Sequence, residues 1–225
     1  MLFDLRSRGR RRTVQGVYLL MAVLLGGGLV LFGVGAGNGI GGILNAFTGN
    51  GSSSAQKQVV SQQETAALKE TRANPKSATA WGDLLQARWT SAGQGANYNA
   101  TAGTFTASGK QELAGATNAW QRYVSLTTSP DPSLAVLAAR AYVALGDYAG
   151  GANAWEKETE SAPGEVKGFE CLAIMAYSAG QSRKGDLAAA KAVSLLPKSQ
   201  QTSVKSSFTA AKASKSSAQQ LAAQC

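Results

Sequence analysis

The N-terminal part of the chain contains one long uncharged stretch. Residues 14–34 read VQGVYLLMAVLLGGGLVLFGV, in which Gln15 is the one strongly polar side chain. At about 1.5 Å rise per residue, a helix of this length spans roughly 30 Å, which is the thickness of the hydrocarbon core of a bilayer. The pattern therefore predicts a transmembrane helix, to which we assign residues 13–35.

Basic residues stand immediately before this stretch, in residues 1–12. They are Arg6, Arg8, Arg10, Arg11 and Arg12. Arginines that flank a span are retained in the cytoplasm, so we expect residues 1–12 inside and the bulk of the chain outside the cytoplasmic membrane. Two alternatives stay open: a cleaved signal peptide with Val34-Gly35-Ala36 as its cleavage site, and a twin-arginine signal at Arg11-Arg12.

Two segments of lower hydrophobicity follow. Residues 36–54 are rich in glycine and serine and predict a flexible linker, although glycines four apart, such as Gly33 and Gly37, also allow transmembrane helices to approach closely. Residues 55–74 have helix-forming composition and a thin apolar stripe, and Asn74-Pro75 ends them. We expect them to form a spacer helix between the membrane and the next domain.

The rest of the chain has a period of 34 residues. Gly146 and Gly180 are separated by this distance, and so are Pro163 and Pro197. In each unit, small residues allow two antiparallel helices to pack closely, and the glycine ends the first of them. The period predicts two complete helix pairs.

An earlier unit is interrupted. It opens with Trp81 and Leu84 and closes with Trp120 and Tyr123. The insert between its helices, residues 94–112, is polar and rich in glycine and threonine, so we expect a long surface loop. Alternation within Ala-Gly-Thr-Phe-Thr-Ala, at 102–107, predicts a short strand or hairpin there.

The final segment, residues 200–225, predicts one capping helix with a basic tail. Val204, Phe208 and Ala211 follow one another at i, i+4 and i+7 and form a single apolar stripe. Such a helix would cover the open end of the stack of helix pairs.

The repeat region, residues 75–199, resembles the tetratricopeptide family. The motifs that carry the resemblance are Tyr142, Leu145-Gly146-Asp147-Tyr148, Ala154-Trp155, Pro163, Phe169, Ala179-Gly180, Gly185 and Pro197. Two positions depart from the family: Glu158 stands where a small residue is preferred, and Ala135 replaces a large aromatic residue. The resemblance implies an all-α fold, an α-solenoid of about three helix pairs.

Proteins of this kind bind extended peptides or helices on the concave face, which the first helix of each repeat lines. The resemblance therefore places the candidate binding residues on those helices. They are Arg88, Arg140, Tyr142 and Tyr177. Arginine can pair with carboxylates and tyrosine offers a rigid amphipathic contact. The two tyrosines also fit positions that pack the repeat core, so a structural role stays open for them.

The composition removes several classes of chemistry. The chain has no histidine, which excludes histidine-based catalytic triads and histidine metal sites. Two cysteines are too few for a structural zinc site; we expect Cys171 in the core, and the state of Cys225 stays open, with a free thiol as one reading. The net charge of +9 gathers at the two ends of the chain instead of along one face. We expect no enzyme activity, cofactor, metal or nucleic-acid ligand.

The order of a basic end, one span, a spacer and external repeats is similar to that of bacterial tetratricopeptide proteins that accompany the protein-export translocon. The resemblance implies a membrane-tethered scaffold or adaptor that binds a protein partner, such as the translocon or a chaperone. Two alternatives stay open: a scaffold for another cell-envelope complex, and a secreted repeat protein that is released by signal cleavage and binds a soluble ligand.

Overall fold

A computed structural model describes residues 53–225. The predicted cytoplasmic segment 1–12, the predicted transmembrane helix 13–35 and nearly all of the linker 36–54 lie outside these residues. Among the helices that are described, none is both long and apolar enough to cross a membrane.

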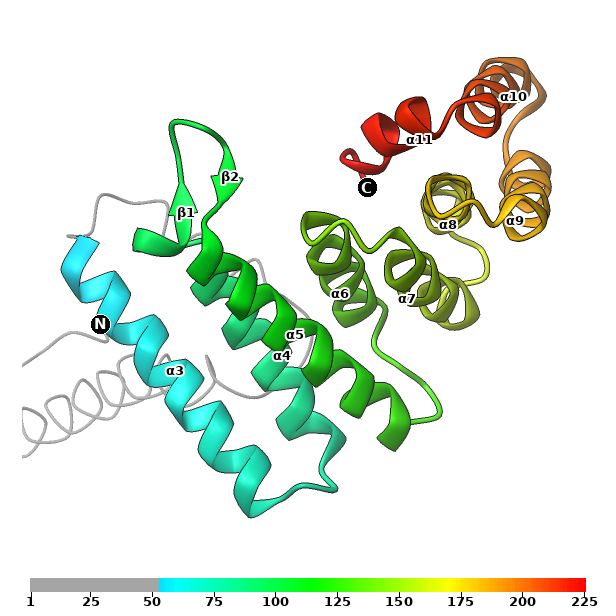
Figure 1. The fold of residues 1–225 in the computed structure, drawn as a ribbon. Helices are drawn as coiled ribbons and strands as arrows, with labels where there is room; N and C mark the ends of the chain where they lie inside the picture. The colour runs from blue at the N-terminus through cyan, green and yellow to red at the C-terminus, as the bar shows by residue number, and fades with distance from the viewer. Residues whose placement is uncertain (1–52) are drawn as a thin grey trace, which may run out of the picture. The chain divides into compact units, whose positions relative to one another are not determined.

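Residues 53–225 form nine α-helices, one short 3-10 turn and one small hairpin (Figure 1). The helices are α3 (Ser53–Ala73), α4 (Ala78–Ala92), α5 (Ala107–Leu126), α6 (Pro132–Ala144), α7 (Tyr148–Ser161), α8 (Val166–Ser178), α9 (Ser182–Leu195), α10 (Lys198–Ala213) and α11 (Lys215–Ala222). They pack as sequential pairs, α4 with α5, α6 with α7 and α8 with α9, and each pair rests on the next. The predicted all-α fold is confirmed for this part of the chain.

The helix ends follow from local sequence signals. Asp131 caps α6, where its carboxylate accepts a hydrogen bond from the Ser133 N–H at 2.7 Å, and Asp147 caps α7 in the same way through the Gly150 N–H at 2.8 Å. Gly146 (φ 79°) and Gly180 (φ 76°) adopt the left-handed conformation directly after α6 and α8. Glycine adopts this conformation without steric cost, so the predicted role of these two residues as helix ends is confirmed.

A tyrosine ring lies on a glycine in both C-terminal pairs. The ring of Tyr142 in α6 covers Gly150 in α7, and the ring of Tyr177 in α8 covers Gly185 in α9. Both rings are buried, and each hydroxyl has a polar partner: Tyr142 Oη accepts from Gln121 at 3.2 Å, and Tyr177 Oη donates to an Asp186 oxygen at 3.0 Å. These rings therefore fill the space between paired helices.

The helix predicted over residues 55–74 is present as α3, but it is not an isolated spacer. It packs along α4 and buries Val60 and Ala67. Glu64 of α3 also pairs with Arg88 of α4 at 3.5 Å. The thin apolar stripe is sufficient because α4 supplies the complementary surface, so α3 belongs to the packed domain.

The insert is shorter than residues 94–112. A 3-10 turn (Gly95–Asn97) leads into an antiparallel hairpin, β1 (Tyr98–Asn99) and β2 (Thr104–Phe105), with Tyr98 opposite Phe105. Thr106 then starts α5, because its hydroxyl accepts a hydrogen bond from the Gly109 N–H at 3.3 Å. The predicted hairpin is confirmed, while residues 107–112 are helical instead of belonging to a loop.

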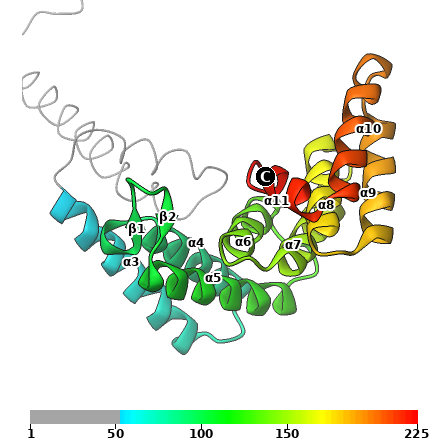
Figure 2. The same ribbon diagram turned by 45° about the horizontal axis from the view of Figure 1, so that its top comes forward.

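The C-terminal segment differs most from expectation. The single helix predicted over residues 200–225 is broken at Ser214 (φ −141°, ψ 118°), and α11 turns back onto α8 (Figure 1, Figure 2). The turn brings Cys225 to Cys171, with a Cα–Cα distance of 5.7 Å, and the two form a disulfide. Cys171 is buried as expected, but the free-thiol interpretation of Cys225 is wrong.

We expect substitution of Gly185 by alanine (Gly185→Ala) to destabilise the protein. The new methyl group would overlap the ring of Tyr177, which is buried and hydrogen-bonded to Asp186. The expected net loss is about 1–2 kcal/mol in the free energy of unfolding, even though alanine is the better helix former. Urea denaturation of the full chain, followed by circular dichroism, measures this loss.

Gly164→Ala is the matched control. Gly164 lies in the turn between α7 and α8, nothing lies within 4 Å of an added Cβ, and its φ is outside the left-handed region. The control is expected to leave stability unchanged or slightly raised. Equal effects of the two substitutions would contradict the packing role assigned to Gly185.

Candidate functional site

The two arginines predicted to bind a partner lie in different surroundings. The Arg88 guanidinium joins three helices, because it pairs with Glu64 of α3 at 3.5 Å and with Glu112 of α5 at 3.1 Å. Arg140 is exposed on α6, and its Nε donates to the main-chain oxygen of Cys225 at 3.2 Å. With Tyr142 and Tyr177 packed against glycines, the four predicted residues do not form one site.

Burial also perturbs the acid beside Arg88. It raises the pKa of the Glu112 carboxyl, the negative charge of Glu64 raises it further, and the Arg88 guanidinium opposes both effects. Arg88 therefore compensates two nearby carboxylates at the junction of α3, α4 and α5. Its charge is used within the domain.

An apolar cleft lies between α7 and α9, with α8 as its floor. Its volume is about 780 Å³. Phe169 and Leu172 of α8 and Ala188 of α9 provide apolar lining, and Leu187 of α9 stands at its edge. The Leu187 side chain is 67% exposed, more than any other large apolar residue of the described chain. A single exposed leucine is ordinary, but an apolar groove that continues into an exposed apolar side chain and has a polar rim is a candidate interaction surface.

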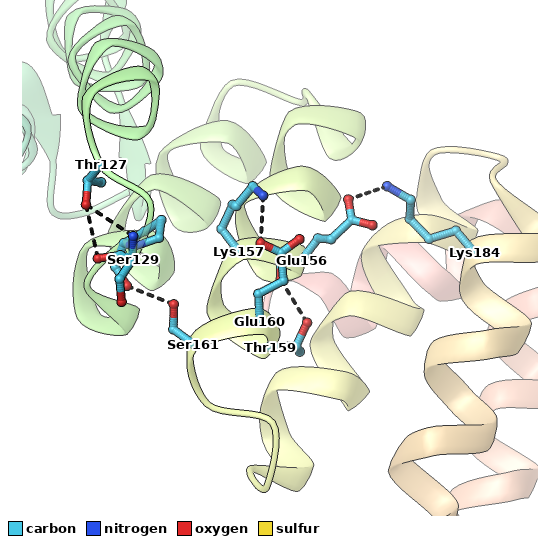
Figure 3. Close-up of polar contacts among 9 residues, drawn as sticks. Thr127, Ser129, Glu156, Lys157, Thr159, Glu160, Ser161 and Lys184 are labelled. Atoms are coloured by element: carbon cyan, nitrogen blue, oxygen red, sulfur yellow. Dashed lines mark hydrogen bonds and ion pairs between the residues drawn. The ribbon is translucent and has the colours of Figure 1, made fainter.

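Charged residues of opposite sign border the cleft. On the α7 side stand Glu156 and Glu160, and on the α9 side stand Arg183 and Lys184. Lys184 Nζ crosses to Glu156 at 2.8 Å, as Figure 3 shows, whereas Glu160 pairs along its own helix with Lys157 at 2.6 Å. These pairs are part-exposed and contribute little to stability, so a partner's charges can compete for them.

One polar atom of the cleft has no partner. Gln181, the residue before α9, lines the cleft, and its side-chain oxygen Oε1 is buried without a hydrogen bond in the described structure. A buried acceptor without a donor is unfavourable. A bound peptide could supply that donor through a backbone N–H or an amide side chain.

Helix periodicity determines which side of α8 faces the cleft. Phe169 and Leu172 are three residues apart and share one face of the helix, whereas Cys171 lies roughly on the opposite face. Lys191 Nζ lies 5.8 Å from the centroid of the Phe169 ring, so a cation borders the apolar floor. The cleft and the disulfide thus use different faces of α8.

The sequence did not predict this cleft, because all four predicted binding residues lie on the first helix of a pair, whereas Leu187 lies on a second helix. A usable signal exists in α9. Its buried residues Gly185, Ala188, Ala189 and Ala192 define one stripe, and Leu187 falls outside it. A leucine off the buried stripe of an amphipathic helix indicates an exposed apolar contact.

The described residues contain no cluster of metal ligands. Within residues 53–225, no three Cys, Asp or Glu side chains lie close enough together to hold a metal ion.

No protein-family model, curated protein or solved structure matches the chain. The fold, an all-helical domain of sequentially paired helices, therefore stands without an identified family.

Glu158 lies beside the residues that line the cleft, and it is buried. Its side chain is 7% exposed, its Oε2 has no hydrogen-bond partner in the described structure, and it packs against Gly168 of α8. Burial raises the pKa of this carboxyl, and the negative charge of Glu165 raises it further. Gly168, which has no side chain, leaves the space in which this departure from the repeat pattern fits.

We expect Glu158→Gln to stabilise the protein at pH 7 by about 1 kcal/mol, because it removes a buried unpaired charge. The folded-state pKa is raised, so the wild-type chain loses stability as the pH rises from the unfolded-state pKa through the folded-state pKa. The advantage of the glutamine variant should therefore shrink toward pH 4. Urea denaturation at several pH values measures it.

Glu160→Gln serves as the control, since Glu160 is exposed and paired with Lys157 on the same helix. It is expected to change stability little at any pH. If Glu158→Gln and the wild-type protein showed the same pH dependence, the buried charge at Glu158 would be refuted.

Proposed function

We propose that the protein is a protein-binding module of the helical-repeat type, and that the cleft between α7 and α9 receives an amphipathic helix of its partner. The observation that carries the proposal is Leu187, exposed to water at the edge of an apolar cleft whose floor contains Phe169 and Leu172. Helix-in-groove recognition uses such surfaces, because the apolar face of the incoming helix is buried against the floor.

The charged residues at the rim of the cleft indicate which charges a partner helix should carry. An incoming helix with an acidic flank toward Arg183 and Lys184 and a basic flank toward Glu156 and Glu160 would be complementary to the cleft. Charge complementarity of this kind fixes the orientation of the bound helix more than it raises affinity. We therefore expect a directional mode of binding with the apolar floor as its main source of affinity.

We also propose that the helix pairs form a tetratricopeptide-like solenoid. The 34-residue spacing of Gly146 and Gly180, their shared left-handed conformation and the sequential pairing of α6 to α9 support this assignment. In such a solenoid Arg140, which is exposed on the first helix of its pair, remains a candidate contact for a partner's carboxylate.

The proposed location is the outer side of the cytoplasmic membrane, with residues 13–35 as the anchor. The Cys171–Cys225 disulfide is consistent with an extracytoplasmic domain, because disulfides persist in oxidising compartments. In that location the protein would act as a scaffold or adaptor in protein export or envelope chaperoning. A scaffold for another envelope complex is the alternative, as is a repeat protein released by cleavage.

We expect Leu187→Asp to weaken partner binding at least about tenfold, because a charge would face the apolar floor of the cleft. Chemical crosslinking in cells, followed by purification of the full chain, measures the yield of each crosslinked partner. Leu126→Asp is the control: Leu126 is 38% exposed at the end of α5 and does not line the cleft. Partners recovered equally with both variants would show that the cleft is not their binding site.

Removal of residues 1–50 separates the candidate roles. If the protein is an export accessory that docks through its membrane helix, translocon subunits should be recovered only with the full chain. Recovery of another envelope partner by both the full and the shortened chain would support the scaffold role and contradict the export role. The crosslinked partners are identified by mass spectrometry.

A further inference from the structure

The face of α8 opposite the cleft is covered by the chain's own C-terminal helix. Helix α11 packs against α8, and Figure 1 and Figure 2 show how the chain turns back after α10 to place it there. Cys171 of α8 is bonded to Cys225, and Ile174 and Ser178 follow Cys171 at i+3 and i+7 on the same side of the helix. Arg140 of α6 donates to the Cys225 main-chain oxygen at 3.2 Å. An arginine predicted to bind a partner is thus engaged through its Nε by an internal segment, although the residue stays exposed.

Apart from the disulfide, α11 is weakly held. It has eight residues, and the side chains that it buries most completely are two alanines, Ala218 and Ala222. A helix of this length is marginal in water, and two methyl groups together with the partly buried Leu221 bury little apolar area. The covalent bond at Cys225 is therefore the main restraint that keeps α11 on α8.

The bend at Ser214 is also unfavourable, because it interrupts the backbone hydrogen bonds of the helix. Without it, α10 and α11 would form one helix over residues 198–222, close to the single capping helix expected for residues 200–225. The bend leaves the N–H groups of Lys215, Ser216 and Ser217 at the start of a new helix, without acceptors in the preceding turn. The Ser214 hydroxyl accepts one of them, from Ser217 at 3.3 Å. A straight helix would provide backbone acceptors for all three.

The preceding helix has anchors of its own. Phe208 and Ala211 of α10 are buried, and Lys212 Nζ bonds to an Asp186 oxygen at 2.8 Å. Asp186 in turn accepts from Tyr177, so α10 is tied to both α8 and α9. Release of the disulfide would therefore free α11 without detaching α10.

We propose that the face of α8 beneath α11, together with Arg140, is a second interaction surface, and that the Cys171–Cys225 disulfide controls access to it by holding the bend at Ser214. The closed disulfide covers the surface with α11. Reduction lets α10 and α11 straighten into one helix and uncovers it. This inference is independent of the cleft, which uses the opposite face of α8.

The opening reaction is thiol–disulfide exchange with a dithiol, such as that of an extracytoplasmic oxidoreductase. A thiolate of the reductant attacks Sγ of Cys225, which as a residue is 7% exposed against 0% for Cys171, and Cys171 leaves as a thiolate that takes up a proton. The second thiol of the reductant resolves the mixed disulfide and releases Cys225 as a thiol. The reductant becomes a disulfide, and two electrons and two protons pass to the cysteines.

The residues that α11 buries against α8 indicate what kind of partner the uncovered face of α8 would bind. Ala218 and Ala222, one helical turn apart, are almost completely buried, so the surface accepts a helix with small residues at i and i+4. Arg140 requires a carbonyl or carboxylate oxygen at the end of that helix. The expected partner is a short helix of the same character as α11.

Hydrogen exchange of the full chain, with and without dithiothreitol, tests the straightening. On reduction, the amides of residues 218–225 should exchange faster, because the seat on α8 is lost. Those of residues 215–217 should exchange more slowly, because they gain helical acceptors. Unchanged exchange, or faster exchange throughout 215–225, would overturn the proposed hinge.

Lys215→Pro gives a locked control. Proline is favoured at the first position of a helix, where Lys215 stands, and the extended Ser214 suits a residue that precedes proline. In a straight helix the same proline would be internal and would clash with the preceding turn. We expect this variant to keep its fold, and to show no slowing at residues 216 and 217 after reduction. Slowing identical to that of the wild-type chain would contradict straightening at Ser214.

A labelled peptide tests the surface itself. The probe has the sequence of residues 214–225 with serine in place of Cys225, and fluorescence anisotropy measures its binding to the full chain. It should bind the reduced protein at least about tenfold more tightly than the oxidised one, and Arg140→Gln should weaken that binding. Equal or absent binding in both redox states would refute the surface. The cleft variant Leu187→Asp should leave peptide binding unchanged, which separates this test from that of the cleft.

Discussion

The contact between a tyrosine ring and a glycine of the following helix sets the arrangement of the C-terminal half. Tyr142 on Gly150 and Tyr177 on Gly185 hold α6 against α7 and α8 against α9 at close range. The tyrosine hydroxyls stay paired, so the buried rings leave no unsatisfied polar atom. Because each pair is held closely, α8 presents one face between α7 and α9 and the other toward α11. Both proposed surfaces depend on this placement.

Local signals in the sequence predicted much of the fold. Gly146 and Gly180 mark equivalent helix ends because few other residues adopt their conformation, and the alternating residues around Phe105 predicted the hairpin. The fold-back of α11 could not be predicted in this way. Val204, Phe208 and Ala211 all lie within α10, so their pattern does not extend across Ser214, and α11 is joined to α8 by cysteines that are 54 residues apart. A local helix pattern does not contain a long-range contact of this kind.

The candidate sites, like the fold, depend partly on long-range contacts that local sequence signals do not contain. The chemistry of arginine and tyrosine suits partner binding, yet Arg88 neutralises two carboxylates within the domain and both tyrosines fill helix interfaces. The cleft depends on which face of α8 lies between its neighbours and on the spacing of α7 and α9, neither of which a single helix pattern contains. Glu158 is a further example, since it departs from the repeat pattern and its contact with Gly168 shows how it is accommodated.

Two claims depend on the Cys171–Cys225 disulfide: that the helical domain lies outside the cytoplasm, and that α11 is held over α8. The oxidation state of both cysteines in the cell tests these claims most directly. Cells are quenched in acid, treated with an alkylating reagent before and after reduction, and analysed by mass spectrometry. The account predicts that both cysteines resist alkylation until reduction and that the Cys171–Cys225 linked peptides are recovered. Direct alkylation of both cysteines, without linked peptides, would contradict it.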